Sequence, residues 1–216
     1  MGNLTLQGST SGQITLAPTA VAGTNTLTLP AVTGTVLASS SGTITVPSGS
    51  GTAAVQGLST NIVSGTAQAT TSGTAILFTG IPSYAKRVTV MFQGVSQNGS
   101  ANKLIQLGNG SIVTSGYVCT YGYATTSLSN TTATNGFQIP YGGLTTEVVY
   151  GSLVFNLITG NTWVCSSFLG SQGGGQPGSF YTSGYIALGS SLDRVNITTV
   201  GAAGTFTAGN INIMYE

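Results

Sequence analysis

Hydrophobic and polar residues alternate along much of this chain, most clearly at residues 87–95. Val88, Val90 and Phe92 are separated there by single residues of other kinds. Period-two alternation that is rich in β-branched and aromatic residues predicts a strand with one buried face. Pro82 introduces a turn before it. We therefore expect this strand to open the part of the chain that holds the main hydrophobic core.

The same pattern continues to the C-terminal residue. Asn-Gly pairs and short Gly-rich stretches separate the strand-like segments, as in tight hairpins; the longest break, 170–179, is predicted to be a flexible surface loop. About ten strands without a helical pattern predict an antiparallel, jelly-roll-like β-sandwich over 74–216. The expected strands are 75–78, 87–95, 102–108, 110–124, 136–140, 147–158, 162–169, 180–188, 193–200 and 210–216.

Residues 1–58 show the alternation in a weaker form. Four- to six-residue β-prone pieces recur there every ten to fifteen residues between Gly, Ser and Pro. One copy has too few large apolar side chains to hold such strands together, whereas copies wound about one axis would share a core and hide strand edges. We expect a β-meander or fibre-like segment in an intertwined homotrimer. Residues 59–73 are predicted to be a linker or an extended strand between the two parts.

Residues 11–37, SGQITLAPTAVAGTNTLTLPAVTGTVL, resemble the SGxITLxP…AGTNTLTLPAxTGT segment of fibre-like virion proteins of tailed bacteriophages. Residues 81–95 and 108–116 are similar to the β-domain that follows this segment in marine and cyanobacterial phage proteins. The resemblance implies that the N-terminal segment attaches to the virion or forms the trimer, and that the β-domain is displayed outward. The residues that carry the attachment role are Ile14, Leu16, Pro18, Leu27, Leu29 and Pro30.

Charge is scarce: only 3% of the residues are charged and the net charge is +1. Ordinary globular proteins have about 25% charged residues. No cluster of Lys and Arg is present that could neutralise nucleic-acid phosphates. No apolar run reaches the ~18 residues of a membrane-spanning helix. We therefore expect no nucleic-acid partner and no membrane insertion, and a surface largely covered by other copies or by partners, which the resemblance implies are other virion proteins.

Catalytic groups are equally scarce. The chain has no His, so the commonest general base is absent. Glu147 and Asp193 are the two carboxylates that a glycosidase would need on one cleft, but solvated or paired roles fit them better. Lys86 and Lys103 are interpreted as solvated amines at sheet edges. We predict no enzyme activity, no cofactor and no metal site.

Two cysteines, Cys119 and Cys165, lie in apolar strand-like segments. They are interpreted as buried thiols, with a disulfide between them as the alternative.

Aromatic residues are the remaining candidates for binding. Three tyrosines follow each other at period two on one strand, and others flank the 170–179 loop. Such rings stack on the apolar faces of sugars, but they also fill cores and subunit interfaces. The candidates for contact with a receptor, such as a host surface glycan, or with another subunit are Tyr117, Tyr121, Tyr123, Trp163, Tyr181 and Tyr185.

The residues alone predict an all-β protein with few charges. The resemblance to phage fibre-like proteins implies a structural virion protein, a trimeric fibre-like tail protein that is assembled in the host cytoplasm. The alternative is a cement or head-fibre protein that decorates the capsid. A tailspike that cleaves polysaccharide is a third hypothesis, and it depends on the two carboxylates named above.

Overall fold

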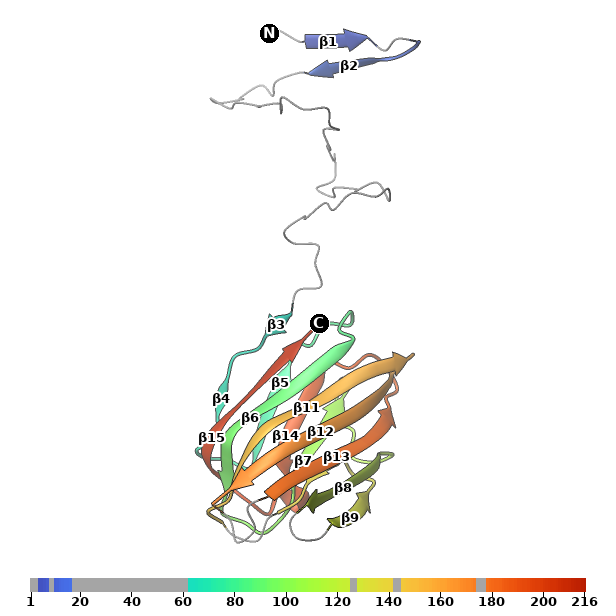
Figure 1. Cartoon of the computed structure of the whole chain (residues 1–216). Coiled ribbons are helices and arrows are strands. Elements are labelled where there is room, and N and C mark those ends of the chain that lie inside the picture. The colour runs from blue at the N-terminus through green and yellow to red at the C-terminus, as the bar shows by residue number, and fades with distance from the viewer. Residues whose placement is uncertain (1–3, 8–9, 17–61, 125–127, 142–144, 174–177) are drawn as a thin grey trace. The chain divides into compact units, whose positions relative to one another are not determined.

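The computed structural model describes residues 4–7, 10–16, 62–124, 128–141, 145–173 and 178–216 (Figure 1). The chain divides into two compact units, Met1–Ala54 and Val55–Glu216. Nearly all regular structure in both units is β, as the sequence predicts; the described part adds only a 3-10 turn at Val200–Ala202.

The first unit contains a β-hairpin. β1 (Leu4–Gln7) pairs antiparallel with β2 (Gln13–Leu16), with Leu4 opposite Leu16 and Leu6 opposite Ile14. This confirms the first two predicted β-prone pieces. The later pieces, and the candidate residues Pro18, Leu27, Leu29 and Pro30, lie outside the described residues.

The second unit is a sandwich of two antiparallel sheets, which Figure 1 shows one behind the other. The smaller sheet has the order β10-β7-β14-β5 and the larger one the order β3-β15-β6-β11-β12-β13-β8-β9, with β4 also paired to β15. The strands are β3 (Val63–Ser64), β4 (Gln68–Ala69), β5 (Ala75–Thr79), β6 (Arg87–Gln97), β7 (Lys103–Gly108), β8 (Val118–Ala124), β9 (Leu128–Ala133), β10 (Phe137–Ile139), β11 (Val148–Thr159), β12 (Thr162–Gln172), β13 (Gly178–Ala187), β14 (Arg194–Thr199) and β15 (Phe206–Tyr215).

The strand order is that of an expanded jelly roll. In a jelly roll of eight strands, one sheet has the order first-eighth-third-sixth and the other the order second-seventh-fourth-fifth. The smaller sheet follows this rule, with β5 as the first strand, β14 as the eighth, β7 as the third and β10 as the sixth. In the larger sheet β6, β8 and β9 are second, fourth and fifth, and the meander β11-β12-β13 takes the place of the seventh. A meander of three antiparallel strands ends in the same direction as a single strand would, so the jelly-roll order is preserved. β15 is an additional strand, paired to the other edge of β6.

The core lies between the two sheets and follows the period-two pattern of the strands. In β6, Val88, Val90 and Phe92 are buried, as the sequence predicts. Phe137 of β10 lies between two rings of other segments, with centroid distances of 5.1 Å to Tyr117 and 5.3 Å to Phe155. Burial of large aromatic and aliphatic side chains is the dominant stabilising term in such a fold.

The structure refines the sequence prediction in three segments. Residues 62–73 fit the extended-strand alternative rather than the linker, because β3 and β4 pair with β15 and so extend the larger sheet. The predicted strand 110–124 is regular only from Val118 to Ala124. The 170–179 loop is shorter than predicted, because β12 continues to Gln172 and β13 begins at Gly178.

One strand, β9, was not predicted from the sequence. Its sequence, LSNTTA, has a single large apolar residue, and it forms the outer edge of the larger sheet beside β8. Backbone pairing with β8, rather than side-chain burial, holds it in place.

The position of each residue in β11 predicts how it tolerates truncation. Phe155→Ala removes a fully buried ring and should lower the free energy of unfolding by about 3–5 kcal/mol. Val154→Ala, on the opposite side of the same strand, should cost about 1 kcal/mol or less. Chemical denaturation of both variants beside the wild type measures the difference. Equal losses would mean that the two faces of β11 are assigned wrongly.

Candidate contact surface

The side chains of the larger sheet that point away from the smaller sheet form a broad surface, here called the outer face. Its strands present mainly Ser, Thr, Asn and Gly, with large apolar or aromatic residues between them. Large exposed side chains of this face include Val118, Tyr150, Phe168 and Tyr185, which are 45–71% exposed. The residues opposite one another in the register of β11, β12, β13 and β8 place these side chains on the same side of the sheet.

Two tyrosines of the outer face lie across glycines on neighbouring strands. Tyr150 is opposite Gly170, and a Cβ added to Gly170 would stand 2.3 Å from the Tyr150 ring. Tyr181 is opposite Gly122, where an added Cβ would stand 2.5 Å from the Tyr181 hydroxyl oxygen. That hydroxyl donates a hydrogen bond to the Ser129 carbonyl oxygen at 2.8 Å. Glycine at these positions therefore lets each ring cover the backbone of the adjacent strand.

The six aromatic candidates do not gather on one surface. Tyr117 and Trp163 are 1% and 2% exposed in the core, and Tyr121 and Tyr123 also pack on the core side of β8. Their burial favours the core interpretation for these four residues. Only Tyr181 and Tyr185 belong to the outer face.

Tyr117 is held in the core by its hydroxyl group. The hydroxyl oxygen accepts a hydrogen bond from the Leu107 N–H at 2.8 Å, and the group lies 2.9 Å from the Val113 carbonyl oxygen. Burial raises the pKa of this hydroxyl above its ordinary range. Tyr117 thus has its polar group satisfied inside the protein and is not available for a ligand.

Sequence reasoning missed Val118, Tyr150 and Phe168 as members of the outer face. Phe168 is adjacent to the fully buried Leu169, and both residues are large and apolar. Alternation shows that two such neighbours point in opposite directions, but it does not tell which one points outward. That choice depends on which face the smaller sheet covers.

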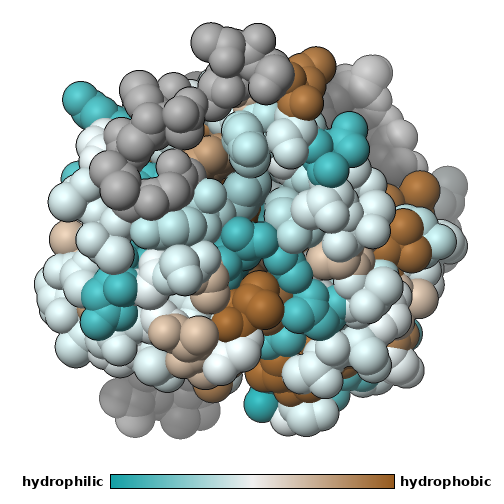
Figure 2. All heavy atoms as spheres, turned by 90° about the horizontal axis from the view of Figure 1, so that it is seen from below, coloured by the Kyte–Doolittle hydropathy of each residue, from teal (hydrophilic) through white to brown (hydrophobic). Residues whose placement is uncertain are grey.

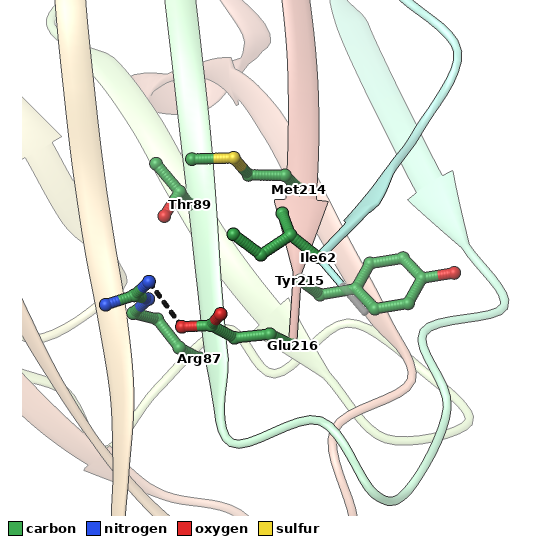
Figure 3. Close-up of a pocket in the computed structure, with 6 residues that line it drawn as sticks. All are labelled: Ile62, Arg87, Thr89, Met214, Tyr215 and Glu216. Atoms are coloured by element: carbon green, nitrogen blue, oxygen red, sulfur yellow. Dashed lines mark ion pairs between the residues drawn. The ribbon is translucent and has the colours of Figure 1, made fainter. Parts of the chain in front are cut away.

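Charged side chains are largely paired with one another. Arg87 and Glu216 form an ion pair at the edge of the outer face, and Figure 3 shows their side chains pointing toward each other. Asp193 and Arg194 form a second pair, 2.7 Å apart, and this contact is the main reason that the pKa of Asp193 is lowered. Figure 2 shows one side of the molecule, where the described surface is mostly neutral in hydropathy with small scattered hydrophilic and hydrophobic patches.

The pocket around the Arg87–Glu216 pair is too small for a ligand. Its volume is about 10 Å³, close to the space needed by a single water molecule. Ile62, which precedes β3, and Met214 of β15 help to line it (Figure 3). The site therefore joins the segment before β3 to the end of β15.

A third charged pair is buried. Lys103 is 1% exposed and Glu147 is 2% exposed, and the two interact electrostatically. Burial lowers the pKa of Lys103, and the negative charge of Glu147 partly opposes that shift. The prediction that Lys103 is a solvated amine at a sheet edge is therefore wrong: β7 lies between β10 and β14 inside its sheet.

Glu147 and Asp193 do not share a cleft. Glu147 interacts with Lys103 at one end of β7, whereas Asp193 accepts a hydrogen bond from the Gly110 N–H at 3.0 Å beyond the other end. Five residue steps of about 3.3 Å separate the ends of β7, or roughly 17 Å. A glycosidase requires its two carboxyl groups about 5–10 Å apart.

Cys119 and Cys165 are buried free thiols. Cys165 of β12 and Cys119 of β8 both pair with Gly184 of β13, which lies between these two strands. Two strand spacings therefore separate the cysteines. Two spacings of about 4.8 Å place the Cα atoms roughly 10 Å apart, beyond the ~7 Å limit for a disulfide. Of the two sequence interpretations, buried thiols fit this arrangement.

Within the described residues, no three His, Cys, Asp or Glu side chains gather where they could hold a metal ion. The same part of the chain contains no helix long and apolar enough to cross a membrane. Comparisons with protein-family models, with curated proteins and with solved structures give no match to this chain.

The two thiols should be unreactive until the protein unfolds. Burial raises the pKa of both, so little thiolate is present at pH 8, and the sulfur atoms are shielded. A thiol reagent such as Ellman's reagent should label neither cysteine in native protein and both in denaturant. Leu128→Cys, on the exposed strand β9, is the control and should add one fast-reacting thiol. Fast labelling of native wild type, or no labelling after unfolding, would contradict this arrangement.

The contributions of Lys103 and Glu147 to the free energy of unfolding should depend on each other. Lys103→Met or Glu147→Gln alone leaves one charge buried and should cost about 3–5 kcal/mol of unfolding free energy, whereas the double variant should cost clearly less than the sum. For comparison, Arg194→Met breaks the more exposed pair and should destabilise the protein much less than either single change. Chemical denaturation of the four variants gives the coupling energy. Strict additivity of the two single changes would show that the two charges do not stabilise each other.

Proposed function

We propose that this chain is a structural protein of a tailed-bacteriophage virion, with a fibre-like trimeric build. Residues 1–58 mount the protein on the virion or intertwine the copies. The β-sandwich is displayed outward and makes contacts through neutral surfaces. The protein acts by binding and has no catalytic role.

The observation that carries this proposal is the contrast between the two units. Among the described residues, the regular structure of the first unit is one two-stranded hairpin, which in isolation is marginally stable in water. Ile14 and Leu16, two of the residues that carry the resemblance to phage fibre-like proteins, lie in β2 of that hairpin. Association with other copies or with a virion protein supplies the burial that this hairpin lacks by itself.

The character of the sandwich surface supports the same proposal. Six of the seven charged residues are used in three pairs. Among the described residues, the only charges on the outer face are those of Arg87 and Glu216, which neutralise each other. Recognition on such a surface depends on shape, ring stacking and neutral hydrogen bonds, which are insensitive to salt. A host surface glycan is a partner of this chemistry, and Tyr181 and Tyr185 remain the predicted contact residues, joined by Tyr150 and Phe168.

A location on the tail and a location on the capsid are both compatible with this architecture. We favour the tail fibre because of the resemblance of residues 11–37. The number of copies per virion distinguishes the two, since a capsid decoration is present in hundreds and a fibre in tens or fewer. A polysaccharide-cleaving tailspike is the least supported alternative, because its two candidate carboxylates are too far apart.

The mass of the protein in solution tests the proposal. The full chain should have three times the mass of one chain by light scattering or native mass spectrometry, unchanged between low and high salt. A chain that begins at Val55 keeps residues 62–73, which pair with β15, and should be a folded monomer. A monomeric full chain would overturn the trimer, and a trimeric short chain would move the trimer contacts to the sandwich.

A further inference from the structure

Three of the four sheet edges of the sandwich are closed by the chain itself. One edge of the larger sheet consists of β3 and β4, which have two residues each and are too short to template another strand. In the smaller sheet, Gln68 Nε2 donates a hydrogen bond to the Leu77 carbonyl oxygen of the edge strand β5 at 3.1 Å. At the opposite edge, Thr182 Oγ1 donates to the Gln138 carbonyl oxygen of β10 at 2.5 Å.

The fourth edge, β9, has none of these protections (Figure 1). It is 6 residues long and pairs with β8 without a register shift. No other described strand lies on its far side in the sheet. Its sequence, LSNTTA, contains no charged residue, proline or glycine. Natural sheets protect a regular edge with charge, proline or a bulge, because an unprotected edge pairs with another strand.

The direction of one carbonyl group shows which backbone groups of β9 are available. The Ser129 carbonyl oxygen accepts a hydrogen bond from the Tyr181 hydroxyl at 2.8 Å, so it is turned toward β8 and β13. Successive residues of a strand direct their backbone groups to opposite sides. The N–H and C=O groups of Leu128, Asn130 and Thr132 therefore point away from β8. The side chains of these three residues lie on the outer face, where Leu128 is 78% exposed.

We propose that β9 pairs antiparallel with β9 of a second copy of this chain, so that the larger sheets of two copies continue into each other. A strand that pairs with its own copy in this way has a two-fold axis at its centre. With Asn130 on the axis, Leu128 lies opposite Thr132 of the second copy, and the outward backbone groups of all three residues find partners. The pairing brings no like charges together, because β9 carries none.

A second copy fits this edge better than an unrelated strand. In the two-fold arrangement the exposed Leu128 side chain packs against the Thr132 methyl group of the other copy, and the same contact forms twice. A single pair of strands buries less area than a stable interface needs, so the contact is weak between free chains. It acts between copies that are already held close together, where the effective concentration is high.

This contact is separate from the trimer contact proposed above, because its symmetry is two-fold and it involves the sandwich alone. In dilute solution a chain that begins at Val55 therefore remains mainly monomeric. The inference does not depend on the proposed virion role.

Disulfide trapping in the full-length protein tests both the pairing and its register. Opposite residues of a hydrogen-bonded antiparallel pair have Cα atoms about 5.5 Å apart, which is within the range of a disulfide. Asn130→Cys should therefore form a disulfide between two chains under mild oxidation, and a non-reducing gel should show the doubled chain mass. Cys119 and Cys165 are buried and should not contribute.

Leu128→Cys and Thr132→Cys are matched controls on the same strand. The two copies of either residue lie four residue steps apart, or roughly 14 Å, which exceeds the ~7 Å limit for a disulfide. Asn130→Cys should cross-link about tenfold faster or more than either control alone, because pairing raises the local thiol concentration. Mixed Leu128→Cys and Thr132→Cys chains should cross-link to each other, because these residues lie opposite in the proposed register.

The proposal is overturned if Asn130→Cys chains cross-link no faster than Leu128→Cys chains. It is also overturned if the Asn130→Cys thiol stays single and reacts slowly with Ellman's reagent, because another segment or another partner then covers the edge. Thermal unfolding of each variant confirms that the comparison is made on folded protein. The cross-link is read between chains whether the full chain is a trimer or a monomer, so a failure of this contact is distinguishable from a failure of the trimer.

Discussion

Phe137 packs against Tyr117 and Phe155 between the two sheets, and the rest of the sandwich depends on contacts of this kind. Each ring comes from a different segment, so their burial fixes β10, the start of β8 and β11 with respect to one another. The chain has few charges, and most of them are paired with neighbours. Burial of apolar surface between the sheets is therefore the main source of stability, supported by the backbone hydrogen bonds of long antiparallel strands.

Much of the fold could be predicted from the sequence because long strands with one buried face have a clear period. Ten expected strands correspond to observed ones, and the Gly160-Asn161 connection between β11 and β12 is as short as predicted. Strand β9 was missed, and the short strands β3 and β4 were expected only as one alternative to a linker, because backbone pairing determines these strands and their side chains give no pattern.

The contact surface was harder to predict than the strands. Period-two alternation separates two faces, but only the second sheet decides which face is buried. Tyr121 and Tyr185 look alike in sequence, yet one faces the core and the other is 48% exposed. The burial of Lys103 is a non-local property for the same reason, since it depends on a strand partner on each side and on Glu147 from another part of the chain.

The unequal number of strands in the two sheets has a geometrical consequence. The path from β15 to β8 contains six strands, or about 24 Å at 4.8 Å per spacing, whereas the four strands of the smaller sheet span about 14 Å. Inner side chains are buried along that whole path, so the larger sheet must curve around the smaller one. The register shifts between β6, β11 and β15 provide the local irregularities that such curvature needs. The outer face is then convex, and a flat partner would touch it only along a ridge, which favours slender partners or copies arranged around an axis.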